Sequence, residues 1–304
     1  MGSFAIRAGC ACIAQLGICA AAWAASPGYT LSAASPARAH DSATIAVNSR
    51  GQSAGYTDTE YGTASHALLA GRGASTDLGT LGGAYSVGTG INEQGQVTGG
   101  AALAGAGGGH AFVYTNGAMV DLGTFGGTLS YGVAINASGQ VTGIASTPGN
   151  AAIRAFLYTH GSMIDLGTLG GDNSSPSALN ERGQVAGVSA TADHALHAFL
   201  YRQGFMSDLG TLGGANSQAN ALNTRGEVTG SADVAGDEPA HAFLYRSQSG
   251  MVDLNKLLAP EVTATGFRLT SGVSIDDHGL IRAEANDGRS YWLTPHAAAA
   301  VATP

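Results

Sequence analysis

Histidine and aspartate recur at a fixed spacing along the chain, and both residue types can act as acids, bases or metal ligands. An aspartate follows each histidine after eleven or twelve residues, and in one copy Arg154 stands in the histidine position. The repeated residues include His110, His197, His241, Asp121, Asp165 and Asp208. Catalysis needs groups that converge on one site, whereas equivalent residues of a repeat lie apart, and arginine serves neither as a base nor as a metal ligand. We therefore predict a structural contact between each histidine and the following aspartate, and no catalytic residue.

Two other patterns could carry chemistry. Residues 51–55, Gly-Gln-Ser-Ala-Gly, match the G-x-S-x-G pattern of serine hydrolases, which requires a strand–turn–helix context. The corresponding segment 95–99 reads Gly-Gln-Val-Thr-Gly and suits a strand instead. His194 and His197 are three residues apart and could chelate a metal, but no third ligand is evident. Phosphate-binding and dinucleotide-binding glycine motifs do not occur, so we predict no metal and no cofactor.

Some polar residues stand outside the shared pattern, in or near loops that differ from copy to copy. Repeat scaffolds usually carry binding on such loops, which here span residues 101–109, 146–152, 190–196 and 231–240. The candidate ligand-binding residues are Asp172, Asn173, Asp193, His194, Asp237 and Glu238. A solvated loop without a ligand is the alternative interpretation.

The elements that position these residues form a repeat of about 44 residues. An Asn-x-x-Gly segment recurs at Asn48, Asn92, Asn136, Asn180 and Asn223, with spacings of 44, 44, 44 and 43. Asn suits the first position of a hairpin turn, and Gly suits the left-handed position that ends it. Short β-branched and aromatic runs surround each turn, and no helical period appears. Each copy therefore predicts four short strands, and a sixth, degenerate copy starts near Gly272.

Four strands in about 40–45 residues are typical of one blade of a β-propeller. The sixth copy lacks a fourth strand, and residues 29–32 precede the first copy at nearly the spacing of one. We predict an all-β, six-bladed β-propeller over residues 29–294, closed by this N-terminal strand in the last blade. An open β-solenoid is the alternative, although a solenoid needs polar caps. Residues 295–304 are expected to form a disordered tail.

The N-terminal segment has the features of an export signal. Arg7 is followed by an apolar run, residues 8–25, that ends in small residues before Pro27, which is typical of a secretory signal peptide. We predict a signal over residues 1–25, with a membrane-anchored helix or a lipoprotein signal at Cys19 as alternatives. All three cysteines lie in this segment, so the mature chain would contain no disulfide and no thiolate.

Charge and hydropathy narrow the classes of partner. The 304 residues carry a formal net charge of −8, with 13 Lys and Arg against 21 Asp and Glu, whereas nucleic-acid binding needs a basic face. No apolar run of about 18 residues follows the N-terminal segment. We therefore expect no nucleic-acid partner, and no membrane insertion once the signal is removed.

The repeated words resemble the HAF-type extracellular repeat family. The resemblance rests on His-Ala-Phe at 110–112 and 197–199 and on Asp-Leu-Gly-Thr-Leu-Gly-Gly at 165–171, and it covers nearly the whole mature chain. It implies an exported bacterial protein without a settled activity, although Arg154 and the first copy, His66-Ala67-Leu68, depart from the pattern. We expect a non-catalytic binding or scaffolding protein with a protein or glycan ligand, either secreted, periplasmic or at the cell surface. A hydrolase or lyase of an extracellular polymer and a purely structural surface repeat are the alternatives.

Overall fold

Short antiparallel strands make up almost all regular structure in the computed structural model of the chain, which describes residues 29–33, 44–58, 64–71, 73–105, 107–236 and 239–296. Within these ranges the only α-helix is α1 (Pro260–Thr263). The same ranges also contain two 3-10 helices, η2 (Pro148–Asn150) and η3 (Leu254–Leu257). None of the helices in these ranges is long and apolar enough to cross a bilayer. The all-β class predicted from the sequence is confirmed.

The strands form six four-stranded antiparallel units, called here sheets 1 to 6. Each of the first five sheets is formed by one copy of the sequence repeat. Sheet 1 contains β2 (Thr44–Val47), β3 (Ser53–Asp58), β4 (Ser65–Gly71) and β5 (Ala74–Asp77), and sheet 2 contains β6 (Gly82–Ile91), β7 (Val97–Leu103), β8 (Gly109–Thr115) and β9 (Ala118–Asp121). Sheet 3 contains β10 (Ser130–Ile135), β11 (Val141–Ser146), β12 (Ile153–Thr159) and β13 (Ser162–Asp165), and sheet 4 contains β14 (Gly170–Leu179), β15 (Val185–Thr191), β16 (Leu196–Arg202) and β17 (Phe205–Asp208). Sheet 5 contains β18 (Gly213–Leu222), β19 (Val228–Val234), β20 (His241–Arg246) and β21 (Gly250–Asp253). One parallel pair, Ser65 with Tyr85, joins sheets 1 and 2 into a single eight-stranded sheet.

Sheet 6 combines the two ends of the chain. It contains β22 (Leu269–Ile275), β23 (Ile281–Ala285) and β24 (Ser290–Pro295), and its outer strand is β1 (Tyr29–Ala33). In the antiparallel register, Leu31 faces Leu293 and Ala33 faces Tyr291. The prediction that the N-terminal strand completes the last sheet is therefore confirmed.

Asparagine side chains at the turns connect neighbouring sheets. Asn92 Oδ1 accepts hydrogen bonds from the backbone N–H groups of Gln94 (3.1 Å) and Gln96 (2.9 Å), and Gly95 ends the turn with φ 78°. Asn92 Nδ2 donates to the backbone carbonyl of Asn136 in the next sheet at 2.9 Å. The same bond links Asn48 to Asn92, Asn136 to Asn180, Asn180 to Asn223, and Asn223 to Asp276. A row of five bonds, called here the asparagine row, thus runs from sheet 1 to sheet 6.

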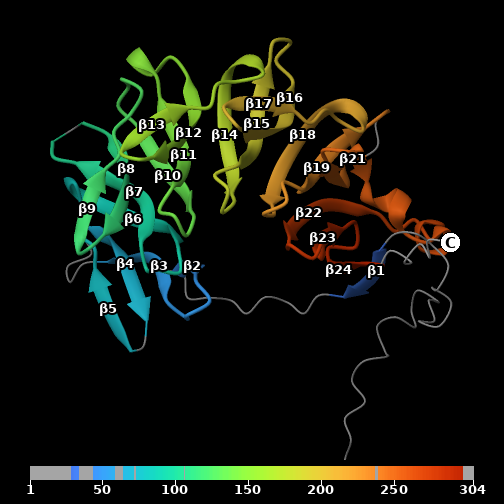
Figure 1. Ribbon diagram of the computed structural model, residues 1–304, viewed down its shortest axis with the longest axis horizontal. Coiled ribbons are helices and arrows are strands. Elements are labelled where there is room, and N and C mark those ends of the chain that lie inside the picture. Colours follow the sequence, from blue (N-terminus) through green and yellow to red (C-terminus); the bar gives the residue numbers. More distant parts are fainter. Residues whose placement is uncertain are drawn as a thin grey trace, which may run out of the picture.

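The six sheets follow one another along an arc whose two ends lie apart (Figure 1). Sheets 1 and 6 stand at these ends, and no buried cluster of the described residues combines side chains of these two sheets, as one cluster does at each of the other junctions. The closed ring predicted from the sequence is therefore not present in this structure. The asparagine row stops at the last sheet because Asp276 carries a carboxylate, which cannot donate to a further carbonyl.

The apolar core lies between the sheets. In each of sheets 2 to 5, one phenylalanine of the third strand is fully buried; these residues are Phe112, Phe156, Phe199 and Phe243. Each buried cluster combines residues of consecutive sheets, and one of them joins Ala186 and Leu200 of sheet 4 to Val228 and Phe243 of sheet 5. Packing of sheet on sheet covers both faces of an inner sheet, which explains why the third strands are apolar on both alternations.

The two ends of each sheet carry different connections. At one end, called here the loop face, lie the links from second to third strand, such as residues 147–152 and 192–195, together with the crossovers between sheets. At the opposite end, called here the turn face, lie the Asn-x-x-Gly turns and the turns from third to fourth strand. The loop face is the end where the sequence predicts a ligand site.

Several predicted features fall outside the described residues. These are the signal at 1–25, the loop residues Asp237 and Glu238, and the tail beyond His296. β24 continues to Pro295, so the first residue of the predicted tail belongs to a strand.

Candidate binding site

The repeated histidines and aspartates pair across the hairpin of the third and fourth strands. Nδ1 of His110 lies 2.9 Å from the carboxylate of Asp121. The contact recurs at 2.9 Å for His66–Asp77, 2.8 Å for His197–Asp208 and 2.9 Å for His241–Asp253, and Arg154 meets Asp165 at 3.7 Å. The contact that the sequence predicts is therefore present in these five copies.

The aspartate of such a pair also anchors the start of the crossover to the next sheet. Asp77 Oδ1 accepts a hydrogen bond from the backbone N–H of Gly79 at 2.8 Å. Burial alone would raise the pKa of Asp77, but the hydrogen bonds from Gly79 and His66 outweigh it and hold the pKa below its ordinary value of 3.8. Asp121, Asp165 and Asp208 accept the same backbone bond from Gly123, Gly167 and Gly210.

The pairs lie on separate sheets and do not converge. Within the described ranges, no three His, Cys, Asp or Glu side chains gather closely enough to hold a metal ion. His197 contacts Asp208, whereas His194 is exposed in a turn with φ 68°. The two histidines that could have chelated a metal therefore have different local roles.

The polar loop residues singled out in sheet 4 lie at its loop-face end. Asn173, on β14, accepts a hydrogen bond from the backbone N–H of Ile153 in sheet 3 at 2.8 Å, and its neighbour Asp172 is exposed. Asp193 accepts a hydrogen bond from the Thr191 hydroxyl, which lowers the pKa of the carboxyl below its ordinary value. His194 donates its backbone N–H to Thr191 at 3.0 Å. No hydrogen bond in the described part of the chain connects the 172–173 pair with the 193–194 pair.

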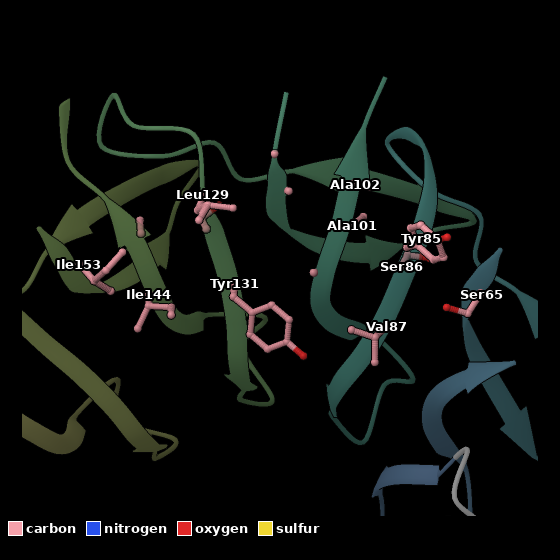
Figure 2. A pocket seen from close by; sticks show the side chains of 15 residues that line it. Ser65, Tyr85, Ser86, Val87, Ala101, Ala102, Leu129, Tyr131, Ile144 and Ile153 are labelled. Carbon is pink, nitrogen blue, oxygen red and sulfur yellow. The ribbon is translucent and has the colours of Figure 1, made fainter. Parts of the chain in front are cut away.

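A pocket of about 540 Å³ opens on the loop face between sheets 1, 2 and 3 (Figure 2). Sheet 2 contributes Tyr85 and Val87 from β6, and sheet 3 contributes Tyr131 from β10 and Leu129 directly before it. Its described lining also contains Ser65, Ser86, Gly100, Ala101, Ala102, Gly108, Gly109, Ser130, Ile144, Ala145 and Ile153. These side chains are apolar or carry hydroxyls, and none of them bears a charge at neutral pH. Pockets of this size with such a lining are typical small-molecule sites.

Two apolar residues at the rim of this pocket depart from the repeat. Each stands directly before a buried serine, and the same position in sheets 4 and 5 holds Asn173 and Asn216. Both asparagines accept a backbone N–H of the preceding sheet, from Ile153 at 2.8 Å and from Leu196 at 3.1 Å. At Tyr85 and Leu129 the backbone makes the bridge to the preceding sheet instead, and the two side chains are 58% and 50% exposed. Sheets 2 and 3 therefore expose large side chains at a position where sheets 4 and 5 carry a bridging asparagine.

The ring of Tyr131 depends on a glycine of the neighbouring sheet. A Cβ added to Gly100 would lie 2.5 Å from Cδ2 of Tyr131, closer than such contacts allow. The equivalent position of the next two sheets is Ile144 and Val188. Partial burial of the ring raises the pKa of the Tyr131 phenol above its ordinary value of 10.0. The glycine thus creates the space in which an aromatic wall of the pocket stands.

The sequence contained a signal for this pocket. Aligned on the repeat, Tyr85 and Leu129 break a column that is polar at Asn173 and Asn216. The residues predicted to bind a ligand were all polar or ionisable, so they included Asn173 but not Tyr85 or Leu129 at the same repeat position. The assembled wall, which combines three sheets, requires the packing of the fold.

Comparisons with known proteins give only distant likenesses. No protein-family model and no curated protein matches the chain. Among solved structures, TolB from Acinetobacter baumannii has a TM-score of 0.41 at 12% identity over 80% of this chain, which spans about half (51%) of that protein. The putative TolB from Agrobacterium tumefaciens has a TM-score of 0.44 at 12% identity, covering 80% of this chain and 90% of that one. A catalytically inactive virginiamycin B lyase from Staphylococcus aureus with quinupristin has a TM-score of 0.32 at 12% identity, covering 88% and 99%. Because these likenesses are weak, the fold description rests on the strand topology of the chain itself.

Proposed function

We propose that this protein is an exported, non-catalytic binding or scaffolding protein of the periplasm, cell surface or extracellular space, and that it binds its ligand on the loop face. The observation that carries the proposal is the pocket of about 540 Å³ that opens on this face and is lined by apolar and hydroxyl-bearing side chains. Variable loops lie at the same end of the sheets, where scaffolds present their binding residues. The export part of the proposal rests on the signal-like composition of residues 1–25.

The proposal includes a closed, six-bladed β-propeller as the working form of the chain. Chain length supports closure. Ala33, the residue of β1 that faces Tyr291, precedes Asn48 by 15 residues, and Asp77, Asp121, Asp165 and Asp208 precede Asn92, Asn136, Asn180 and Asn223 by the same 15. The link from sheet 6 to sheet 1 therefore has the length of the four links that connect sheets 1 to 5.

Unburied apolar surface on sheet 1 also supports closure. In sheets 2 to 6, the residue before the turn Asn or Asp packs against the core shared with the preceding sheet; these residues are Ile91, Ile135, Leu179, Leu222 and Ile275. Val47 occupies this position in sheet 1 and is 50% exposed, and Ile45 beside it is 51% exposed. Docking of sheet 6 against sheet 1 would cover both side chains, as the other junctions do.

The binding function is tested by screening purified protein against a glycan array and against a panel of neutral apolar compounds by thermal shift. We expect a ligand class that raises the Tm without being turned over. Its affinity should fall when an exposed residue of the pocket is replaced, as in Tyr85→Glu, and should be unchanged in the turn-face control Arg182→Glu, since both parent residues are exposed. Turnover of an extracellular polymer, with no ligand found in either screen, would contradict the proposal.

A further inference from the structure

The geometry points to a neutral, largely apolar small molecule with an aromatic or alicyclic ring as the ligand of the pocket between sheets 1, 2 and 3. This inference deepens the proposed function and rests on it, because it names the ligand class of one site on the loop face.

The size of the pocket favours a small molecule over a protein surface. About 540 Å³ lies within the range of roughly 300–1,000 Å³ that drug-sized ligands occupy. The walls come from three sheets, so the space is concave, whereas a docked protein commonly meets a broad and nearly flat area. Figure 2 shows Leu129 and Ile153 on one side and Tyr85 and Ser65 on the other, with Tyr131 and Val87 between them.

The lining favours a neutral ligand. Its described side chains include no Asp, Glu, Lys, Arg or His, so a charged group would lose hydration without gaining a counter-charge. The polar side chains are hydroxyls, and those of Ser86 and Ser130 are already engaged by the backbone of the fold. The phenol groups of Tyr85 and Tyr131 hydrogen-bond to no other described residue. Together with the hydroxyl of Ser65, which also lines the pocket, they remain as the groups that can orient a carbonyl or hydroxyl of the ligand.

The departures from the repeat indicate that the pocket is a selected feature. Tyr85 and Leu129 bridge to the preceding sheet through their backbones, so their side chains are not needed for that contact. Both side chains are instead large and about half exposed, at a position where sheets 4 and 5 carry an asparagine that bonds to its neighbour. Gly100 admits the ring of Tyr131, where the next two sheets carry Ile144 and Val188. Sites that break the local rules of a fold without a gain in packing are commonly functional sites.

The test uses N-phenyl-1-naphthylamine, a neutral fluorescent ring compound, and its anionic analogue 1-anilinonaphthalene-8-sulfonate. We expect saturable binding of the neutral probe at one site per chain and clearly weaker binding of the sulfonate. Leu129→Asn, which installs the residue of the equivalent position in sheets 4 and 5, should weaken binding by about tenfold because it removes the apolar contact of one leucine.

Leu196→Asn is the matched control. Leu196 is 49% exposed at the loop-face end of sheet 4 and does not line the pocket, so its replacement should leave binding unchanged. Thermal unfolding of both variants confirms that they fold. Lack of saturable binding, equal binding of the two probes, or equal losses in Leu129→Asn and Leu196→Asn would overturn the inference. If the glycan array then still gives a loop-face ligand, the proposed function stands and only the pocket's assignment fails.

Discussion

At the scale of single residues, the clearest irregularity is Arg154. It replaces the histidine of the repeated His–Asp pair, lies 3.7 Å from Asp165, and leaves its Nε buried without a hydrogen-bond partner among the described residues. An unpaired buried donor costs about 1–3 kcal/mol. Arg154 therefore marks a position where the chain is less stable than its own repeat would allow.

We expect Arg154→His to raise the Tm by a few degrees, because it restores the pair found at His110–Asp121 and removes the unpaired Nε. The reverse substitution in a matched copy, His197→Arg, should lower it. Differential scanning calorimetry of the two variants at pH 7 measures both changes. A lower Tm for Arg154→His would show that the arginine contributes an interaction that we have not recognised.

A second residue-scale prediction concerns pH and Glu227. Burial acts to raise the pKa of this carboxyl, but hydrogen bonds from Arg246, Arg225 and Asn223 lower it below the ordinary value of 4.5. A carboxyl whose pKa is depressed in the folded state adds stability above pH 4.5, and this stability is lost as the pH falls through the folded pKa. Gln52, Gln96, Gln140 and Gln184 occupy the same position in sheets 1 to 4.

When the pH falls from 6 to 3, the Tm of Glu227→Gln should therefore decrease by less than the Tm of the unaltered protein. The comparison is made by thermal unfolding followed by circular dichroism at several pH values. Gln184→Ala serves as a control for a change at this turn position that removes no charge, and its pH dependence should match that of the unaltered protein. Parallel pH profiles for Glu227→Gln and the unaltered protein would refute the assignment.

At the scale of the strands, neighbouring sheets approach closely where a first strand crosses the second strand of the preceding sheet. Gly132 of β10 lies against buried Thr98 of β7, and a Cβ added to Gly132 would stand 2.2 Å from Thr98 Oγ1. The equivalent pair between sheets 4 and 5 is Ala186 with Ala219, both fully buried. The space between two facing residues at a junction is therefore limited, so a larger residue on one sheet requires a smaller residue on the other.

Gly132→Ala should lower the midpoint of urea unfolding, with a cost of about 1–3 kcal/mol from overpacking. The double variant Thr98→Ala with Gly132→Ala reproduces the Ala186–Ala219 pair and should recover part of the loss. Gly107→Ala is the control, since a Cβ there meets nothing closer than 3.9 Å. An unchanged midpoint for Gly132→Ala, or a double variant less stable than the single one, would contradict this view of the junctions.

The strands and turns could be predicted because the interactions that form them are local. Asn92 and Gly95 fix their own turn by bonds within five residues, so spacing alone located it. The partner of Asn92 Nδ2 is a carbonyl 44 residues away, and nothing in the local sequence specifies that bond. The same limit applies to the pocket, since Tyr85, Leu129 and Ile153 come together only through the packing of three sheets.

At the scale of the whole molecule, the open question is the junction between sheets 6 and 1. It differs from the other five in two ways. Asp276 has no side-chain N–H to donate to the backbone carbonyl of Asn48, so the asparagine row cannot continue. The facing pair would be Thr44 and Arg282, which are larger than the Gly132 and Thr98 pair between sheets 2 and 3. The link of normal length and the exposed Val47 nevertheless favour contact between the two sheets. We therefore expect a closed ring whose last junction is less tightly packed than the others.

The most direct measurement of this central claim is a pulsed electron–electron resonance distance across the junction. The body of the chain has no cysteine, since all three lie within residues 1–25, so spin labels can be placed singly at exposed turn positions. Arg50→Cys with His278→Cys spans sheets 1 and 6, and Ser138→Cys with Arg182→Cys spans the adjacent sheets 3 and 4 at the same repeat position. The account predicts similar distance distributions for the two pairs in the monomeric protein, with the first pair somewhat broader. A distance between Arg50→Cys and His278→Cys far longer than that of the control pair would mean that the arc stays open in solution, and the propeller would be ruled out.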